Sequence, residues 1–164
     1  MLKFNKKGGA NSIHATDSTK LLTASSTFAV KEAYNSIRTN LLFTQQGEKC
    51  PIFVVTSPTA NNGKTINSAN LAINFAQMGK KTLVIDADMR NPSLHKLFSL
   101  SSRNGLSEIL ADFTDFNATV QHVGENLDVL PAGHTAPNPS ELLGSPRFKA
   151  LLEDLSTKYK YILI

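Results

Sequence analysis

Cysteine is almost absent from this chain of 164 residues, which contains only Cys50. A single cysteine excludes an internal disulfide framework and a cysteine-based metal cluster, and this scarcity fits a protein of the cytosol. The sequence also lacks the run of about 18 apolar residues that a membrane-spanning helix needs, and its N-terminus lacks the apolar core of a signal peptide. We therefore expect a cytoplasmic protein whose contact with a membrane passes through a partner.

Strong charge of one sign is also lacking. The sequence holds 17 Lys and Arg against 13 Asp and Glu, a formal net charge of +4. No dense basic run and no known nucleic-acid-binding motif appears, so we expect no nucleic-acid partner. Metal-ligand spacing is absent from the histidines, which are His14, His95, His122 and His134.

Residues 1–27 lack the hydrophobic periodicity of a folded segment. They contain spaced lysines, two glycines and a Ser/Thr-rich stretch. This composition predicts a disordered basic arm, and the folded domain is expected to cover 28–164. A solubilising tail is the ordinary interpretation, and contact with acidic lipid headgroups is the alternative.

A phosphate-binding arrangement is predicted after residue 51. An apolar, β-branched run at 52–55 indicates a buried strand, turn-forming residues follow at 56–63, and helical periodicity begins at Thr65. In this order, loop amides and the helix start bind a phosphate, Lys64 reaches the β and γ phosphates, and the Thr65 hydroxyl ligates Mg²⁺. The residues expected to contact nucleotide are Ser57, Thr59, Ala60, Asn61, Asn62, Gly63, Lys64, Thr65 and Ile66.

The usual P-loop pattern is met only in part. Its first glycine would fall at Pro58, so an ordinary connection between a strand and a helix stays open as an alternative.

A second apolar strand ends in Asp86-Ala87-Asp88. Carboxylates at the carboxyl end of a strand beside a P-loop lie where Mg²⁺ and a transferring phosphoryl group are held. Asp86 and Asp88 are therefore predicted as metal-binding and catalytic residues together with Lys64. A turn or helix-cap role is the alternative for Asp88 alone.

Several segments resemble the bacterial tyrosine kinases of capsule and exopolysaccharide synthesis, P-loop ATPases related to MinD and ParA. Residues 57–66 are similar to their Walker A segment, and residues 82–92 to their Walker A′ segment. The Gly-Leu-Ser helix at 104–110, the Leu-Pro-Ala-Gly segment at 130–133 and the Asn-Pro-Ser-Glu-Leu-Leu segment at 138–143 extend the likeness. In this kinase family, a glycine at the position of Asn61 eases the approach of the backbone to phosphate. Asparagine tolerates left-handed dihedral angles better than most residues, so we expect it to replace glycine at modest cost.

The resemblance implies an ATP- and Mg²⁺-dependent protein-tyrosine kinase that autophosphorylates and regulates capsular or exopolysaccharide biosynthesis. It leaves open whether Asp86 or Asp88 orients the metal or accepts the tyrosine proton. The implied partners are protein-tyrosine substrates and the cytosolic tail of a transmembrane polysaccharide chain-length regulator, which would recruit the protein to the inner face of the membrane. The alternatives are a non-catalytic truncated regulatory protein and a MinD/ParA-like positioning ATPase, which would carry a lysine in place of Thr59.

Residues 28–46 form a predicted amphipathic helix. Its apolar stripe consists of Val30, Ala33, Ile37 and Leu41. Glu32, Asn35 and Arg38 are expected on the polar side. The resemblance implies that Glu32 and Arg38 join subunits into a ring, and that Asn35, which replaces an arginine of the family pattern, weakens this contact.

The predicted fold class is α/β, with a doubly wound, mainly parallel sheet of the P-loop NTPase type. Parallel strands are expected at 52–55, 82–85, 127–130 and 161–164. The last of these resembles the strand that leads into the Walker B aspartate of the family. Because that aspartate would follow Ile164, the sequence predicts a domain that is incomplete at its C-terminus.

Overall fold

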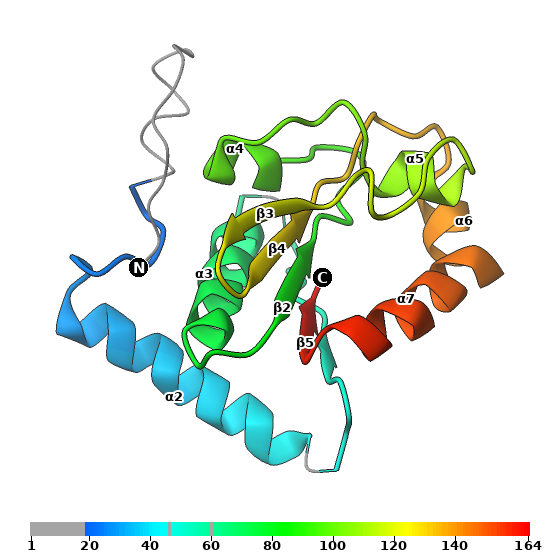
Figure 1. The fold of residues 1–164 in the computed structure, drawn as a ribbon. Helices are drawn as coiled ribbons and strands as arrows, with labels where there is room; N and C mark the ends of the chain where they lie inside the picture. The colour runs from blue at the N-terminus through cyan, green and yellow to red at the C-terminus, as the bar shows by residue number, and fades with distance from the viewer. Residues whose placement is uncertain (1–18, 46, 60) are drawn as a thin grey trace.

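The computed structural model describes residues 19–45, 47–59 and 61–164, and its centre is a five-stranded sheet (Figure 1). The strands are β1 (Ile52–Phe53), β2 (Thr82–Ile85), β3 (Gln121–Gly124), β4 (Leu127–Leu130) and β5 (Tyr161–Leu163). Their order in the sheet is β1-β5-β2-β4-β3, and only β3 runs antiparallel to its neighbour. The prediction of a mainly parallel α/β sheet is confirmed.

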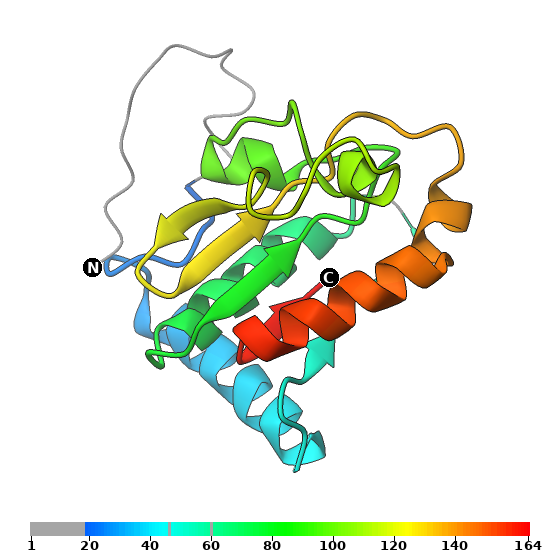
Figure 2. The ribbon, with the colours of Figure 1, turned by 45° about the vertical axis from the view of Figure 1, so that its right-hand side comes forward.

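Helices cover both faces of the sheet (Figure 2). They are α2 (Phe28–Thr44), α3 (Lys64–Ala76), α4 (Leu94–Phe98), α5 (Leu106–Leu110), α6 (Pro139–Leu143) and α7 (Pro146–Lys158). α3 and α4 pack on one face, and α5, α6 and α7 on the other. Among the helices of the described residues, none has both the length and the apolar character to cross a membrane.

The alternation of strand side chains explains this double layer. In β2, the side chain of Val84 joins the core beneath α3, whereas Leu83 and Ile85 join the core beneath α7. Because every residue of β2 is buried, the strand needs cover on both faces, as parallel strands usually do. β5 lies between β1 and β2, so the carboxyl ends of the three strands meet at one edge.

Three strands differ from the sequence prediction, and the smallest difference is at β5, which ends at Leu163 and not at residue 164. β3 was not expected, because Gln121-His122-Val123-Gly124 is neither apolar nor buried and forms an edge strand through its pairing with β4. β1 is shorter than the predicted 52–55. Its pairing nevertheless continues beyond Phe53, since the Val55 amide donates to the carbonyl of Ile164 at 2.8 Å.

The inward face of α2 agrees only in part with the predicted apolar stripe, since Leu41 packs against the core beneath α3. Val30 and Ile37 each keep 44% of their surface exposed. Instead, Asn35 accepts a hydrogen bond from Asn74 at 2.8 Å, and Arg38 donates to the Asn74 carbonyl at 2.8 Å. Asn35 and Arg38, which were expected on the polar side of the helix, thus face polar groups of α3, whereas Glu32 on the same side is exposed.

Folded structure begins before residue 28. Leu21 and Leu22 retain only 3% and 2% exposure in the core beneath α3. The Leu22 amide also donates to the Asn70 side chain at 2.8 Å. The predicted disordered arm therefore does not extend to residue 27, and its residues 1–18 lie outside the described part of the chain.

Candidate active site

The loop between β1 and α3 turns through two residues with left-handed backbone. Asn61 has a φ of 61° and Gly63 a φ of 76°. Asparagine at the first position fits the expectation that it replaces glycine there. Gly63 stands at the N-cap of α3 and has no side chain to cap it, so the first amides of this helix are available to an anion.

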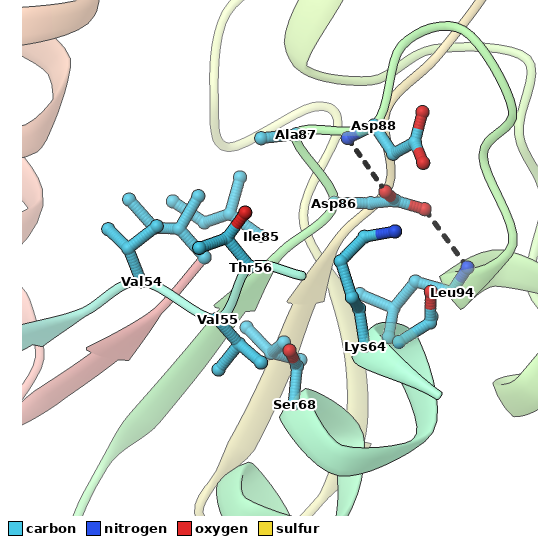
Figure 3. Close-up of a pocket in the computed structure, with 13 residues that line it drawn as sticks. Val54, Val55, Thr56, Lys64, Ser68, Ile85, Asp86, Ala87, Asp88 and Leu94 are labelled. Carbon is cyan, nitrogen blue, oxygen red and sulfur yellow. Dashed lines mark hydrogen bonds between the residues drawn. The ribbon is translucent and has the colours of Figure 1, made fainter. Parts of the chain in front are cut away.

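Four of the predicted residues line one cavity of about 310 Å³ at the carboxyl ends of the strands (Figure 3). Lys64 and Thr65 come from the start of α3, and Asp86 and Asp88 follow β2. Figure 3 shows the Lys64 side chain extending toward the two aspartates. The further lining residues are Val54, Val55, Thr56, Ser68, Val84, Ile85, Ala87, Leu94 and Ile164.

Asp86 is the more enclosed of the two aspartates, with 6% of its surface exposed. Its carboxylate accepts hydrogen bonds from the amides of Asp88 at 3.1 Å, Ser93 at 3.1 Å and Leu94 at 2.9 Å. Burial raises the pKa of this carboxyl, although the three amide bonds oppose the rise. A cation in the cavity would favour its ionised form, so the site suits a divalent metal.

Asp88 is less constrained. Its side chain accepts a hydrogen bond from the Asn91 amide at 3.0 Å, and the residue is half-buried. Opposite it, the Ser93 hydroxyl donates to the Thr65 hydroxyl at 3.0 Å. Hydroxyl and carboxylate oxygens are the ligands that Mg²⁺ prefers. The sequence analysis did not predict a role for Ser93. No known motif pairs a residue at this distance after β2 with the threonine of a phosphate-binding loop.

Among the residues that the structure describes, the other predicted nucleotide contacts do not line this cavity. Within the loop, Ser57 donates to the Thr59 carbonyl and Asn62 donates to the Thr59 hydroxyl, each at 2.6 Å. Ile66 packs against the core beneath α3. Ala60 lies outside the described residues. For these loop residues and for Asn61 and Gly63, contact with nucleotide stays a prediction.

The residues predicted to join subunits lie on α2. Glu32 is exposed and accepts a hydrogen bond from Asn35 at 2.9 Å. Arg38 is half-buried, and its guanidinium donates a hydrogen bond to the Asn74 carbonyl of its own chain. A subunit contact through Glu32 and Arg38 stays a prediction.

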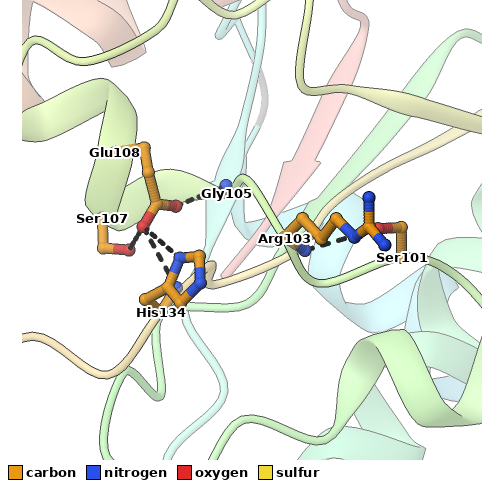
Figure 4. Close-up of polar contacts among 6 residues, drawn as sticks. All are labelled: Ser101, Arg103, Gly105, Ser107, Glu108 and His134. Atoms are coloured by element: carbon orange, nitrogen blue, oxygen red, sulfur yellow. Dashed lines mark hydrogen bonds and ion pairs between the residues drawn. The ribbon is translucent and has the colours of Figure 1, made fainter.

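Two segments of the family resemblance pack against each other (Figure 4). Glu108 of α5 accepts hydrogen bonds from the Gly105 amide at 2.7 Å and from the Ser107 hydroxyl at 3.0 Å, and its Oε1 lies 3.0 Å from His134 Nδ1. Although burial alone would raise the pKa of Glu108, the bonds from His134, Ser107 and Gly105 hold it below its ordinary value. This contact fixes the loop after β4 at the same edge of the sheet as the cavity.

Together, the left-handed turn into α3, the lysine and hydroxyl at its start and the carboxylates after β2 define a P-loop nucleotide-binding domain. The family model described as AAA domain matches residues 54–164. The chain belongs to this family.

Comparison with individual proteins shows which P-loop proteins this chain is similar to. The putative tyrosine-protein kinase CapB of Staphylococcus aureus is 39% identical over 136 residues, which cover 82% of this chain and 60% of CapB. The kinase domain of the Escherichia coli tyrosine kinase ETK is 40% identical with a TM-score of 0.77, over 81% of this chain and 52% of that domain. The resemblance to bacterial tyrosine kinases is confirmed, and the chain spans 60% of the length of CapB.

A more distant neighbour carries a nucleotide. The septum site-determining protein MinD of Pyrococcus horikoshii, complexed with Mg-ADP, is 26% identical with a TM-score of 0.60. The match covers 70% of this chain and 48% of MinD.

Proposed function

We propose that this chain forms the nucleotide-binding part of an autophosphorylating protein-tyrosine kinase that uses ATP and Mg²⁺ and regulates capsular or exopolysaccharide biosynthesis. The observation that carries the proposal is the convergence of Lys64, Thr65, Asp86 and Asp88 on one cavity. The relatives named as tyrosine-protein kinases support the type of reaction. The MinD complex supports a magnesium nucleotide as the ligand.

The cationic and hydroxyl groups of the cavity bind the nucleotide in this proposal. Lys64 contacts oxygens of the β and γ phosphates, and the first amides of α3 hold the same anion. Thr65 contributes its hydroxyl and Asp88 its carboxylate to Mg²⁺. The metal, when bound, neutralises charge that develops on the transferring phosphoryl group.

The two aspartates divide their roles. Asp86 holds the turn 86–94 through three backbone amides, so both of its oxygens are engaged within the chain. Asp88 keeps acceptor capacity beyond its bond to Asn91, since a carboxylate accepts about four hydrogen bonds. We assign metal orientation and acceptance of the tyrosine hydroxyl proton to Asp88, and loop positioning to Asp86.

The partners and the place of action are proposed from the family resemblance. They are protein-tyrosine substrates, further copies of the protein in a ring that uses Glu32 and Arg38, and the cytosolic tail of a transmembrane chain-length regulator. That tail would bring the protein to the inner face of the membrane. The exposure of Glu32 supports an intermolecular role for this residue, whereas Arg38 would have to give up or share its bond to α3.

A radiolabel transfer assay tests the activity. The full-length gene product, supplied with γ-labelled ATP, Mg²⁺ and a tyrosine-containing protein, is expected to label tyrosine, and Asp88→Ala is expected to lower the rate by on the order of 10² or more. ATP hydrolysis without tyrosine labelling would instead favour a MinD-like ATPase.

A further inference from the structure

The side chain of Tyr34 on α2 is joined to the phosphate loop by hydrogen bonds. The Tyr34 hydroxyl donates to the Asn67 side-chain oxygen at 2.9 Å. Asn67, in the first turns of α3, donates from its side-chain nitrogen to the Gly63 carbonyl at 3.0 Å. Its backbone amide donates to the same carbonyl at 2.9 Å. Gly63 immediately precedes Lys64, so this chain of contacts ends at the nucleotide site.

The contacts extend in the other direction to the N-terminal segment. The buried Asn70 donates from its side-chain nitrogen to the Tyr34 hydroxyl and to the Lys20 carbonyl, each at 3.1 Å. Its side-chain oxygen accepts from the Leu22 amide at 2.8 Å. The Tyr34 hydroxyl thus accepts from Asn70 and donates to Asn67, which fixes the direction of the whole series.

The backbone conformation of Gly63 explains why the hydrogen bonds from Asn67 matter for the start of α3. Its φ of 76° is left-handed, and the start of α3 depends on this residue because Gly63 is the N-cap. A β carbon at Gly63 would lie 3.3 Å from the Asn67 side-chain nitrogen, so the two residues pack closely. A loop held in its bound conformation binds its ligand more tightly, because less ordering remains to be done on binding.

We propose that Tyr34 is a positioning residue for the nucleotide site, acting on Gly63 through Asn67 and anchored to the N-terminal segment through Asn70. The proposal rests on the proposed nucleotide binding and adds a route of regulation. A partner that moves α2 or residues 20–22 would change the affinity for nucleotide without touching the cavity.

A double-mutant cycle tests this route. Calorimetry measures Mg-ADP affinity for the full chain, Tyr34→Phe, Asn67→Ala and the double variant. Tyr34→Phe keeps the ring that packs against the core and removes only the hydroxyl. Each single variant is expected to weaken binding by about 3- to 10-fold, the scale of one hydrogen bond. The double variant should bind no more weakly than Asn67→Ala, since both changes break one route.

Tyr159→Phe is the matched control. It removes a buried tyrosine hydroxyl that donates to Asp128 at 2.6 Å and does not line the cavity. We expect it to lower the melting temperature and leave Mg-ADP affinity unchanged. Unchanged affinity in Tyr34→Phe, or additive losses in the double variant, would overturn the positioning role. Failure of the unaltered chain to bind Mg-ADP would instead overturn the proposed nucleotide binding itself.

Discussion

The hydroxyl of Ser93 donates a hydrogen bond to the hydroxyl of Thr65 across 3.0 Å, so a residue after β2 orients the predicted metal ligand on α3. The Ser93 amide is itself bound by Asp86 at 3.1 Å. This places Thr65, Ser93 and Asp86 in one hydrogen-bonded unit at the edge of the cavity.

Ser93→Ala should weaken binding of Mg-ADP by a few-fold, about the effect of one hydrogen bond, because the Thr65 hydroxyl loses the group that orients it. Binding of ADP in the presence of a chelator should not change, since the proposed contacts of Lys64 with the phosphates do not involve the metal. Calorimetry with and without Mg²⁺ measures both. Equal losses under the two conditions would contradict an effect through the metal.

Separate replacement of Asp86 and Asp88 distinguishes a role in stability from a role in catalysis. Asp86→Ala should reduce the free energy of unfolding by about 3 kcal/mol, because three backbone amides lose a buried charged acceptor. Asp88→Ala should change that free energy by less than about 1 kcal/mol, while it lowers the rate of tyrosine phosphorylation by on the order of 10² or more. Urea unfolding compares the two variants, and similar losses of stability would refute the division of roles.

Tyr159 should make stability depend on alkaline pH. Burial, followed by the hydrogen bond to the Asp128 side chain, raises the pKa of the Tyr159 hydroxyl in the folded chain. Because the unfolded chain then releases this proton first, the stabilisation is complete below about pH 10 and declines as the pH rises further.

Tyr159→Phe should therefore reduce the free energy of unfolding by about 1–2 kcal/mol at neutral pH. The gap between variant and parent should narrow above about pH 10. Urea unfolding at a series of pH values measures this gap. Parallel curves for the two proteins throughout the alkaline range would show that Tyr159 does not titrate in the way the structure indicates.

Gly105 lies against the backbone of the loop after β4 and has no room for a side chain. A β carbon there would lie 2.0 Å from the Gly133 amide nitrogen and 2.3 Å from the Pro131 carbonyl oxygen. Gly105→Ala is expected to lower the free energy of unfolding by about 3 kcal/mol or more, the cost of severe overpacking.

Gly79→Ala provides the contrast. Gly79 has a φ of 71° but open space around its missing side chain, so the cost should be only about 1 kcal/mol of backbone strain. Thermal melting of both variants tests the distinction, and equal destabilisation would show that the close contact at Gly105 costs no more than the backbone strain at Gly79.

Local patterns predicted the centre of the molecule well. Asp86 and Asp88 directly follow the buried strand β2, whereas Lys64 and Thr65 begin the helix that the loop after β1 leads into. Because the carboxyl ends of parallel strands meet at one edge, the convergence of these four residues could be predicted without tertiary contacts. The buried strand 82–85 was apparent from its apolar residues alone.

Features that depend on contacts between distant polar groups could not be predicted. The face of α2 that turns inward carries Asn35 and Arg38, whose partner Asn74 is far away in the sequence. Leu22 is buried although it follows a Ser/Thr-rich stretch, because Asn70 satisfies its amide. Ser93 reaches Thr65 only because the turn 86–94 folds back over Asp86.

Calorimetric titration of Mg-ADP into the chain and into Lys64→Ala tests the central claim most directly, with Lys80→Ala as the control for an exposed lysine outside the cavity. We predict that Lys64→Ala loses about 1.5–3 kcal/mol of binding free energy, the size of a charge-assisted hydrogen bond, and that Lys80→Ala binds like the parent. Equal affinity of the parent and Lys64→Ala would contradict the assignment of this cavity as the nucleotide site.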